Sequence, residues 1–274
     1  MINLESIKGH TLRNIIKIRN LLWLHKTDMF YRVGIETTNE CNRRCSYCPM
    51  SLDKNFVKKV MKKELFYKII KELKQIKFKG EICLVVYGEP LLDKRIEGFV
   101  RYVNKQLNIK PHFFTNGDFL TIYKFRKLIN CGLKIMIIAQ HGKVQSKNLE
   151  RFFKQATKED LKYVRFDKVS EDSCLVSRSG IDVKNKMFMS RFCRSPSSLI
   201  PIRADGIISL CCNDYFNEVI QGDVNKQSLM EIWNNPINKR RRIELSKGIL
   251  TPNLCKVCVY GKQKKNEKTN NNYY

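Results

Sequence analysis

Two hydrophobic periods alternate along the middle of the chain, and their alternation predicts parallel βαβ units. Apolar runs of strand length occur at RVGIETT (32–38), EICLVVYG (81–88), KPHFFTNG (110–117), LKIMIIAQ (133–140) and KYVRFDKV (162–169). Between them, apolar residues recur at helical spacing over residues 61–77, 93–107 and about 148–156. Asp118 is placed to be the N-cap of the helix after the third run. Strands and helices repeated in this order predict an α/β fold with a parallel sheet.

The alternating pattern stops around Lys184–Phe192, and we place a domain boundary near residue 188. Beyond it, IRADGIISLCC (202–212) has the polar turn of a hairpin. The segment SLMEIWNN is typical of a helix, with Ser228 and Glu231 at the spacing of a capping box. A smaller unit that mixes strands and helices is therefore expected after the main domain.

The chain begins with a basic amphipathic segment, TLRNIIKIRNLLWLH (11–25), in which cations separate the apolar residues. Such a helix could cap the main domain or lie on a membrane surface as a peripheral contact. The polar, low-complexity end of the chain is expected to be disordered. The predicted segments are an N-terminal extension, a main domain, a smaller domain and a tail, at 1–30, 31–188, 189–262 and 263–274.

The charge of the chain is strongly basic, with 52 Lys and Arg against 26 Asp and Glu. A net charge of +26 would suit nucleic acid, an anionic membrane face or a phosphorylated substrate. The cations are spread along the chain, however, and Lys, Asn and Ile are all abundant, which is typical of compositional bias. Charge alone therefore identifies no binding partner, and we do not expect the protein to bind nucleic acid.

Eleven cysteines stand in a chain of 274 residues that begins without a predicted signal peptide. The apolar runs also fall short of the roughly 20 residues that a membrane-spanning helix needs. A reducing cytoplasm is the expected setting, and there clustered thiols bind metal or take part in redox chemistry.

Three of these cysteines are crowded into CNRRCSYCPM: Cys41, Cys45 and Cys48, with three and then two residues between them. Thiols on a loop after a strand could hold zinc, fill the core or hold an iron–sulfur cluster. Structural zinc usually takes four protein ligands, whereas three thiolates leave one corner of the metal site open. An open corner is useful only if another molecule binds there.

The CxxxCxxC spacing, with the aromatic Tyr47 just before the third cysteine, resembles the motif of the radical SAM superfamily. In that family three thiolates hold a 4Fe–4S cluster, and its unique iron is chelated by the amino and carboxylate groups of S-adenosylmethionine. The resemblance implies that Cys41, Cys45 and Cys48 are the catalytic metal ligands, that Tyr47 lies at the cofactor, and that the fourth ligand is the cosubstrate.

A second motif, YGEPLLD, resembles the GGEP sequence of that family, with Tyr87 in place of the first glycine. The resemblance implies that Gly88, Glu89 and Pro90 contribute to cofactor binding. The carboxylate of Glu89 would suit the cationic amino group of the methionyl moiety.

A third motif follows the third predicted strand, where Thr115, Asn116 and Gly117 match the TNG often seen in the family close to the cosubstrate. The fourth strand ends in AQHG, where many relatives have a serine that contacts the ribose; Gln140 or His141 could replace it. These motifs all fall at the C-terminal ends of predicted parallel strands, the edge at which α/β folds place their chemistry.

The last third of the chain holds five more cysteines, and a CxxC pair with distant partners would first suggest structural zinc. Its context resembles instead the SPASM/twitch extension of radical SAM proteins. Full SPASM domains need more cysteines than five, so the resemblance implies the shortened form with one auxiliary 4Fe–4S cluster. Cys212 competes with Cys211, because neighbouring side chains on a strand point to opposite faces. The assigned ligands are Cys193, Cys211, Cys255 and Cys258.

The implied fold is a partial (β/α)6 TIM-like barrel with a small C-terminal α+β auxiliary-cluster domain. Cys83, Cys131 and Cys174 lie in or beside apolar segments and are expected to be small buried hydrophobic residues. Arg178 lies at or after the last core strand. It could bind the carboxylate of the cosubstrate or act on the substrate.

The implied activity is reductive cleavage of S-adenosylmethionine to a 5′-deoxyadenosyl radical, which abstracts hydrogen from a substrate. We expect a net oxidation of a small molecule such as a sugar or cyclitol, which could be anionic, with electrons from a reductant such as flavodoxin or ferredoxin. Peptide or sulfatase modification is an alternative. A non-catalytic metal-cluster protein that binds nucleic acid is an alternative of another class, but it leaves Glu89 without a task.

Overall fold

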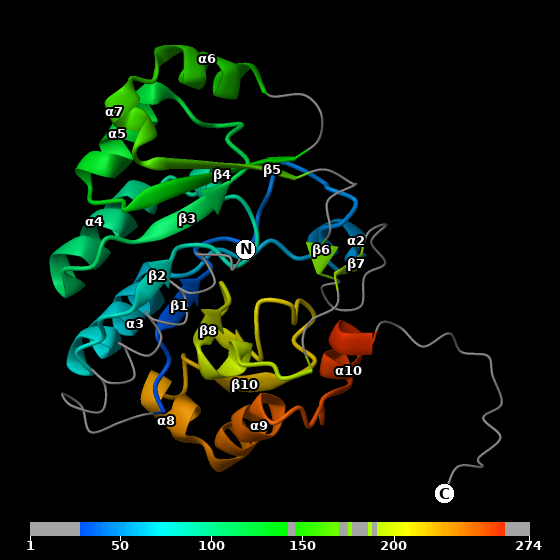
Figure 1. Cartoon of the computed structure of the whole chain (residues 1–274). Coiled ribbons are helices and arrows are strands. Elements are labelled where there is room, and N and C mark those ends of the chain that lie inside the picture. The colour runs from blue at the N-terminus through cyan, green and yellow to red at the C-terminus, as the bar shows by residue number, and fades with distance from the viewer. Residues whose placement is uncertain (1–27, 142–145, 170–174, 177–185, 188–190, 261–274) are drawn as a thin grey trace, which may run out of the picture.

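The computed structural model describes residues 28–141, 146–169, 175–176, 186–187 and 191–260. Its main sheet has eight strands in the order β10-β9-β8-β1-β2-β3-β4-β5 (Figure 1). Their bounds are β1 (Arg32–Ile35), β2 (Glu81–Cys83), β3 (His112–Thr115), β4 (Ile135–His141), β5 (Val164–Val169), β8 (Leu199–Ile202), β9 (Ile207–Ser209) and β10 (Ile220–Asp223). Two further strands, β6 (Leu175–Val176) and β7 (Lys186–Met187), pair with each other.

The centre of the main sheet is parallel. Strands β1 to β5 pair in parallel in chain order, and β8 joins β1 in parallel on the other side, with Gly34 opposite Pro201. Strands β9 and β10 then continue the sheet antiparallel. Six adjacent parallel strands therefore end at one edge, and the predicted α/β fold with a parallel sheet is confirmed.

The helices of the main domain alternate with its strands, and α3 to α6 lie along one side of the sheet in Figure 1. The α-helices are α2 (Pro49–Leu52), α3 (Lys63–Gln75), α4 (Ile96–Leu107), α5 (Ile122–Asn130), α6 (Lys147–Gln155), α7 (Lys158–Leu161), α8 (Leu229–Asn234), α9 (Pro236–Ser246) and α10 (Asn253–Tyr260), and the 3-10 turns are η1 (Pro90–Leu92) and η3 (Ser195–Ser197). None of the helices in these described segments is long and apolar enough to cross a membrane.

One hydrophobic core joins the helices of the main domain to the sheet and extends to α8. Phe66 of α3 stacks on Phe99 of α4 with ring centroids 4.0 Å apart. Trp233 of α8 packs edge-on against Phe30 at 5.1 Å, and its indole nitrogen donates to the carbonyl of Asp28. The C-terminal segment therefore shares both its sheet and its core with the main domain.

One predicted cap is wrong. Thr121, not Asp118, begins α5, and its side chain accepts a hydrogen bond from the backbone of Lys124. The Asp118 carboxylate instead accepts hydrogen bonds from Arg43, because Asp118 lies three positions before the N-cap residue and the cysteine loop is within its reach. The capping box of Ser228 and Glu231 at α8 is confirmed.

Several predictions lie outside the described residues: the extension at 1–27, the tail from 261, Cys174, Arg178 and the boundary near residue 188. Of the expected buried cysteines, Cys131 is buried and Cys83 is only half-buried. Cys83 lies opposite His112 on the neighbouring strand. Its side chain is therefore on the opposite face from the core residues Ile82 and Leu84.

Candidate metal centre

The first three cysteines lie on the loop between β1 and α2, at the edge where the parallel strands end. Cys41, Cys45 and Cys48 are free and half-buried. The backbone of Cys48 donates to the carbonyl of Cys45 at 3.0 Å, and the backbone of Arg43 donates to the Cys41 sulfur at 3.4 Å. Burial raises the pKa of the Cys41 and Cys45 thiols. A metal that binds here must therefore displace their protons.

The cysteine loop is held by the loop after β3. The Arg43 guanidinium forms two hydrogen bonds with Asp118, of 2.5 and 2.7 Å, and Asn42 adds a third of 2.7 Å. The amide of Asn116 donates to the Cys41 sulfur at 3.8 Å. Two-point Arg–carboxylate contacts fix orientation as well as distance. Arg43 and Asp118, which the sequence analysis left without a functional role, thus position the cysteines.

Tyr47 lies within this loop. Its side chain is half-buried and forms a hydrogen bond with the Cys45 thiol. The aromatic residue before the third cysteine therefore contacts a predicted ligand directly.

Glu89 is the buried centre of the second and third motifs, with only 2% of its surface exposed. It accepts hydrogen bonds from the Thr115 hydroxyl at 2.6 Å, the Asn116 backbone at 2.8 Å and the Leu91 backbone at 3.0 Å. Burial raises the pKa of this carboxyl, and the bond from Thr115 opposes that shift. A carboxylate offers about four acceptor positions, so capacity remains for one further donor.

Gly88 allows the strand end to approach the cysteine loop. Its φ is +82°, and a Cβ there would lie 2.6 Å from the Thr38 carbonyl oxygen. The next residue, Glu89, donates its backbone N–H to the carbonyl of Glu40 at 2.7 Å. Pro90 follows as the first residue of the 3-10 turn η1. The motif thus joins β2 to the residue that precedes Cys41.

The TNG motif and Gln140 complete this edge. Thr115, Asn116 and Gln140 are buried polar residues at the ends of β3 and β4. Gly117 has a φ of +76°, and a Cβ there would meet Leu149 at 3.0 Å. The structure therefore brings the predicted motifs from β1 to β4 together at one edge, while Arg178 lies outside the described residues.

The second group of cysteines gathers from three separate segments. Cys193 donates its backbone N–H to Leu245, and Cys255 and Cys258 lie one helical turn apart on α10. Burial, followed by the neighbouring Cys193, raises the pKa of Cys255 to about 12 and of Cys258 to about 11. These effects require the thiols to lie near one another.

Cys211 and Cys212 follow β9, and their surroundings differ. Burial raises the pKa of Cys211, with Cys212, Cys193 and Cys255 adding to the effect. Cys212 is exposed. Cys211 is half-buried and lies near the other thiols, which supports its assignment over Cys212.

The donor set bears on which metal group could bind. Among the residues that the structure describes, no group of three Cys, His, Asp or Glu side chains forms a site for a single metal ion. All the cysteines of both groups are free thiols, and thiolates are the ligands of iron–sulfur clusters. Both groups of cysteines therefore have the donors that a 4Fe–4S cluster needs.

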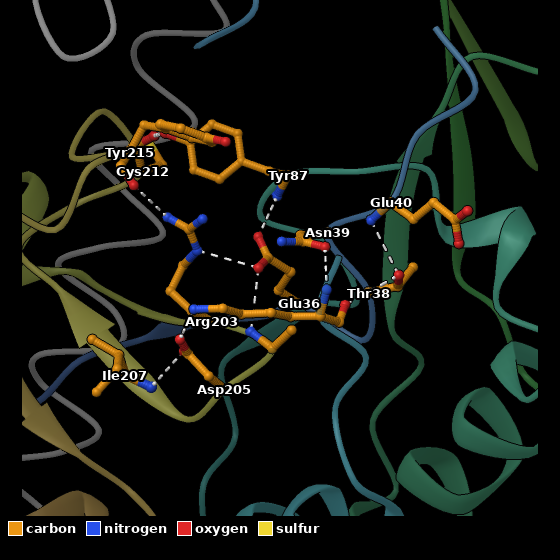
Figure 2. Close-up of polar contacts among 12 residues, drawn as sticks. Glu36, Thr38, Asn39, Glu40, Tyr87, Arg203, Asp205, Ile207, Cys212 and Tyr215 are labelled. Carbon is orange, nitrogen blue, oxygen red and sulfur yellow. Dashed lines mark hydrogen bonds and ion pairs between the residues drawn. The ribbon is translucent and has the colours of Figure 1, made fainter. Parts of the chain in front are cut away.

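Two buried charges at this edge were missed by the sequence analysis: Glu36, after β1, and Arg203, after β8. They pair through Arg203 Nε and Glu36 Oε1 at 3.2 Å (Figure 2). Each ends an apolar run, in RVGIETT and SLIPIRADG. A single charge at the end of a buried strand was the available signal, since isolated buried charges are costly and therefore paired.

Two protein-family models match the chain, one over each group of cysteines. The model of the radical SAM superfamily matches residues 35–162, and that of the SPASM iron–sulfur cluster-binding domain matches residues 193–259. Both matches contain the cysteines that the structure gathers.

The chain is also similar to S-adenosyl-L-methionine-dependent 2-deoxy-scyllo-inosamine dehydrogenase of Niallia circulans, with 29% identity over 84% of this chain and 93% of that one. The crystal structure of BtrN in complex with AdoMet and 2-DOIA has a TM-score of 0.77, also at 29% identity, and the same coverage. Streptococcus suis SuiB bound to S-adenosylmethionine shares the fold, with a TM-score of 0.52, 15% identity and coverage of 93% of this chain and 78% of that one. With its two matching domains and its cysteine loop at the parallel sheet edge, the chain belongs to the radical SAM superfamily.

Proposed function

We propose that this enzyme is a radical SAM dehydrogenase that oxidises an alcohol carbon of a cyclitol, sugar or related small molecule. The observation that carries the proposal is the similarity to 2-deoxy-scyllo-inosamine dehydrogenase across nearly the whole of that protein. A second group of cysteines supports it, because such an oxidation removes two electrons in separate steps.

The residues that would hold the cofactors are those of the two cysteine groups. Cys41, Cys45 and Cys48 would bind one 4Fe–4S cluster and leave one iron for S-adenosylmethionine. The auxiliary cluster would bind to Cys193, Cys211, Cys255 and Cys258. When bound, the first cluster and S-adenosylmethionine would supply a carbon radical that removes a hydrogen atom. The auxiliary cluster would supply an acceptor for one electron.

The chain's own residues orient the cosubstrate and exclude water. Glu89 is fixed by three donors and has acceptor capacity for an ammonium group, the role that we assign to it. Gly88 lets the end of its strand approach the cysteine loop, and Gly117 packs closely against Leu149, so both glycines hold the motif loops in place. Arg178 is the candidate for a contact to the carboxylate of the cosubstrate or to the substrate, and Gln140 is the candidate for a contact to the ribose.

The proposed oxidation removes two electrons and two protons from the alcohol. Its carbon loses one hydrogen atom to the 5′-deoxyadenosyl radical, and the remaining radical loses one electron and the hydroxyl proton. A carbonyl forms, and one S-adenosylmethionine becomes 5′-deoxyadenosine and methionine. The first electron comes from an external reductant such as flavodoxin or ferredoxin, and a reducing cytoplasm would keep the thiols available.

Anaerobic reconstitution with iron and sulfide tests the proposal. After reduction with dithionite, we expect iron for two four-iron clusters and formation of 5′-deoxyadenosine. With 2-deoxy-scyllo-inosamine as the first probe, followed by a panel of cyclitols and phosphorylated sugars, one carbonyl product should form per 5′-deoxyadenosine. A zinc-loaded protein that leaves S-adenosylmethionine intact would contradict the proposal, as would modification of a peptide in place of every small molecule.

A further inference from the structure

Tyr87 stands where the family motif has glycine, and its large side chain lies between the two cysteine groups. It is 4% exposed and belongs to a small buried cluster with Met50 and Tyr215. Cys41 and Cys48 pack against that cluster. The residue that departs from the motif therefore touches the environment of the first metal centre.

Two tyrosines connect the two cysteine segments through their hydroxyl groups. The Tyr87 hydroxyl donates to the carbonyl oxygen of Cys212, next to the predicted ligand Cys211. The Tyr215 hydroxyl donates to Asp53, which ends helix α2 after the first cysteine loop, at 3.0 Å. The two rings meet edge-on with centroids 4.9 Å apart. We refer to Tyr87 and Tyr215 as the tyrosine clasp.

The buried ion pair of Glu36 and Arg203 contacts both residues of the tyrosine clasp (Figure 2). Glu36 is 1% exposed and accepts hydrogen bonds from the Tyr87 backbone at 3.0 Å and from Arg203 at 3.2 Å. The Arg203 guanidinium also donates to the Tyr215 carbonyl at 3.1 Å and lies 4.7 and 5.3 Å from the centroids of the Tyr87 and Tyr215 rings. One guanidinium thus contacts both tyrosines and the carboxylate that holds one of them.

We infer that the tyrosine clasp, held by Glu36 and Arg203, positions the auxiliary cysteine group relative to the first one. This inference rests on the proposed function, since it concerns the transfer of the substrate's second electron. Electron transfer slows steeply with distance, and the predicted ligand Cys211 lies in the irregular segment 211–215 between β9 and β10, in which Tyr215 is buried. The clasp joins this segment to the first cysteine segment, and Tyr87 and Tyr215 are positioning residues.

Single hydroxyl deletions test this inference in the reconstituted enzyme. Tyr87→Phe and Tyr215→Phe keep both rings and remove one hydrogen bond each, and Tyr123→Phe, at a side chain 74% exposed on α5, is the control. We expect 5′-deoxyadenosine formation within about twofold of the original rate. The yield of carbonyl product per 5′-deoxyadenosine should fall about fivefold, since one such bond contributes about 1 kcal/mol.

Two further measurements separate positioning from general stability. The magnetic interaction between the two reduced clusters, measured by electron paramagnetic resonance, should change in both variants and not in the control. Amide hydrogen exchange of residues 210–217, measured before S-adenosylmethionine is added, should become faster. A double variant with an unchanged product ratio and an unchanged resonance spectrum overturns the inference, even if its overall activity is lower.

Failure of the inference about the tyrosine clasp can be distinguished from failure of the proposed function. If the unmodified enzyme forms no oxidised product, the proposed function fails, while hydrogen exchange still decides the clasp. Faster exchange at 210–217 in Tyr87→Phe then supports the clasp, and unchanged exchange overturns it.

Discussion

Gly88 shows at the scale of one residue how backbone geometry builds the site. Its positive φ and its 2.6 Å approach to the Thr38 carbonyl leave no room for a Cβ. Gly98, in the first turn of α4, has open space around the same position. The two glycines therefore form a matched pair.

Gly88→Ala should destabilise the fold by at least about 1–2 kcal/mol, because an L side chain is strained at this φ. It should also lower the rate of 5′-deoxyadenosine formation by about 10- to 100-fold, since the cysteine loop must shift. Gly98→Ala should instead stabilise α4 by about 0.5–1 kcal/mol and leave the rate unchanged. Urea unfolding and the cleavage assay measure both effects; equal behaviour of the two variants would contradict the explanation.

The buried ion pair of Glu36 and Arg203 should behave non-additively. Glu36→Gln leaves a buried guanidinium without its charge partner, and we expect a loss of about 3–5 kcal/mol in the free energy of unfolding. Arg203→Met should cost a similar amount, because burial then raises the pKa of Glu36 without an opposing cation. The double variant should recover part of the loss. Additive losses in urea unfolding would show that the two charges act independently.

At the scale of single elements, the start of α5 separates capping from positioning. Thr121→Ala should reduce stability by about 1 kcal/mol, because the helix loses its N-cap. Asp118→Ala should leave α5 intact and release Arg43, so the cysteine loop should retain less iron after reconstitution. Circular dichroism with urea and iron analysis distinguish the two effects. Loss of the helix in Asp118→Ala would restore the cap that the sequence alone suggested.

The helices and strands themselves were largely predictable. The apolar periodicity of residues 61–77 and 93–107 predicted α3 and α4 to within a few residues, because burial of one face dominates helix formation. The strands are shorter than their apolar runs; the end of EICLVVYG, for example, leaves the ladder after Cys83 to form the motif loop. Pairing with neighbouring strands, which periodicity does not contain, decides where a strand ends.

At the scale of the whole molecule, the C-terminal segment is part of the main body. Trp233 is buried in the shared core and lies under the Arg242 guanidinium at 3.7 Å. Trp233→Ala should therefore cost about 3–5 kcal/mol in a single unfolding transition. Tyr123→Ala, at an exposed residue, is the control. A separate early transition of the C-terminal segment would show that it folds independently.

The two cysteine groups should separate radical formation from oxidation. Cys41→Ala, Cys45→Ala and Cys48→Ala together should abolish 5′-deoxyadenosine formation, since no open cluster can form. Cys255→Ala with Cys258→Ala should spare some 5′-deoxyadenosine formation but stop the carbonyl product. Both are measured by chromatography of the same anaerobic reaction. Full product formation without Cys255 and Cys258 would remove the proposed role of the second group.

The sequence by itself determined the α/β class, the cysteine loop and the placement of the motifs at strand ends, because periodicity and spacing are local properties of the chain. Only the tertiary structure decided that β8 pairs with β1, that Asp118 holds Arg43, and that Glu36 meets Arg203. Glu36 and Arg203 are 167 residues apart, and no local pattern encodes contacts at that separation. Packing of the complete sheet brings them together, and with them the tyrosines between the two cysteine groups.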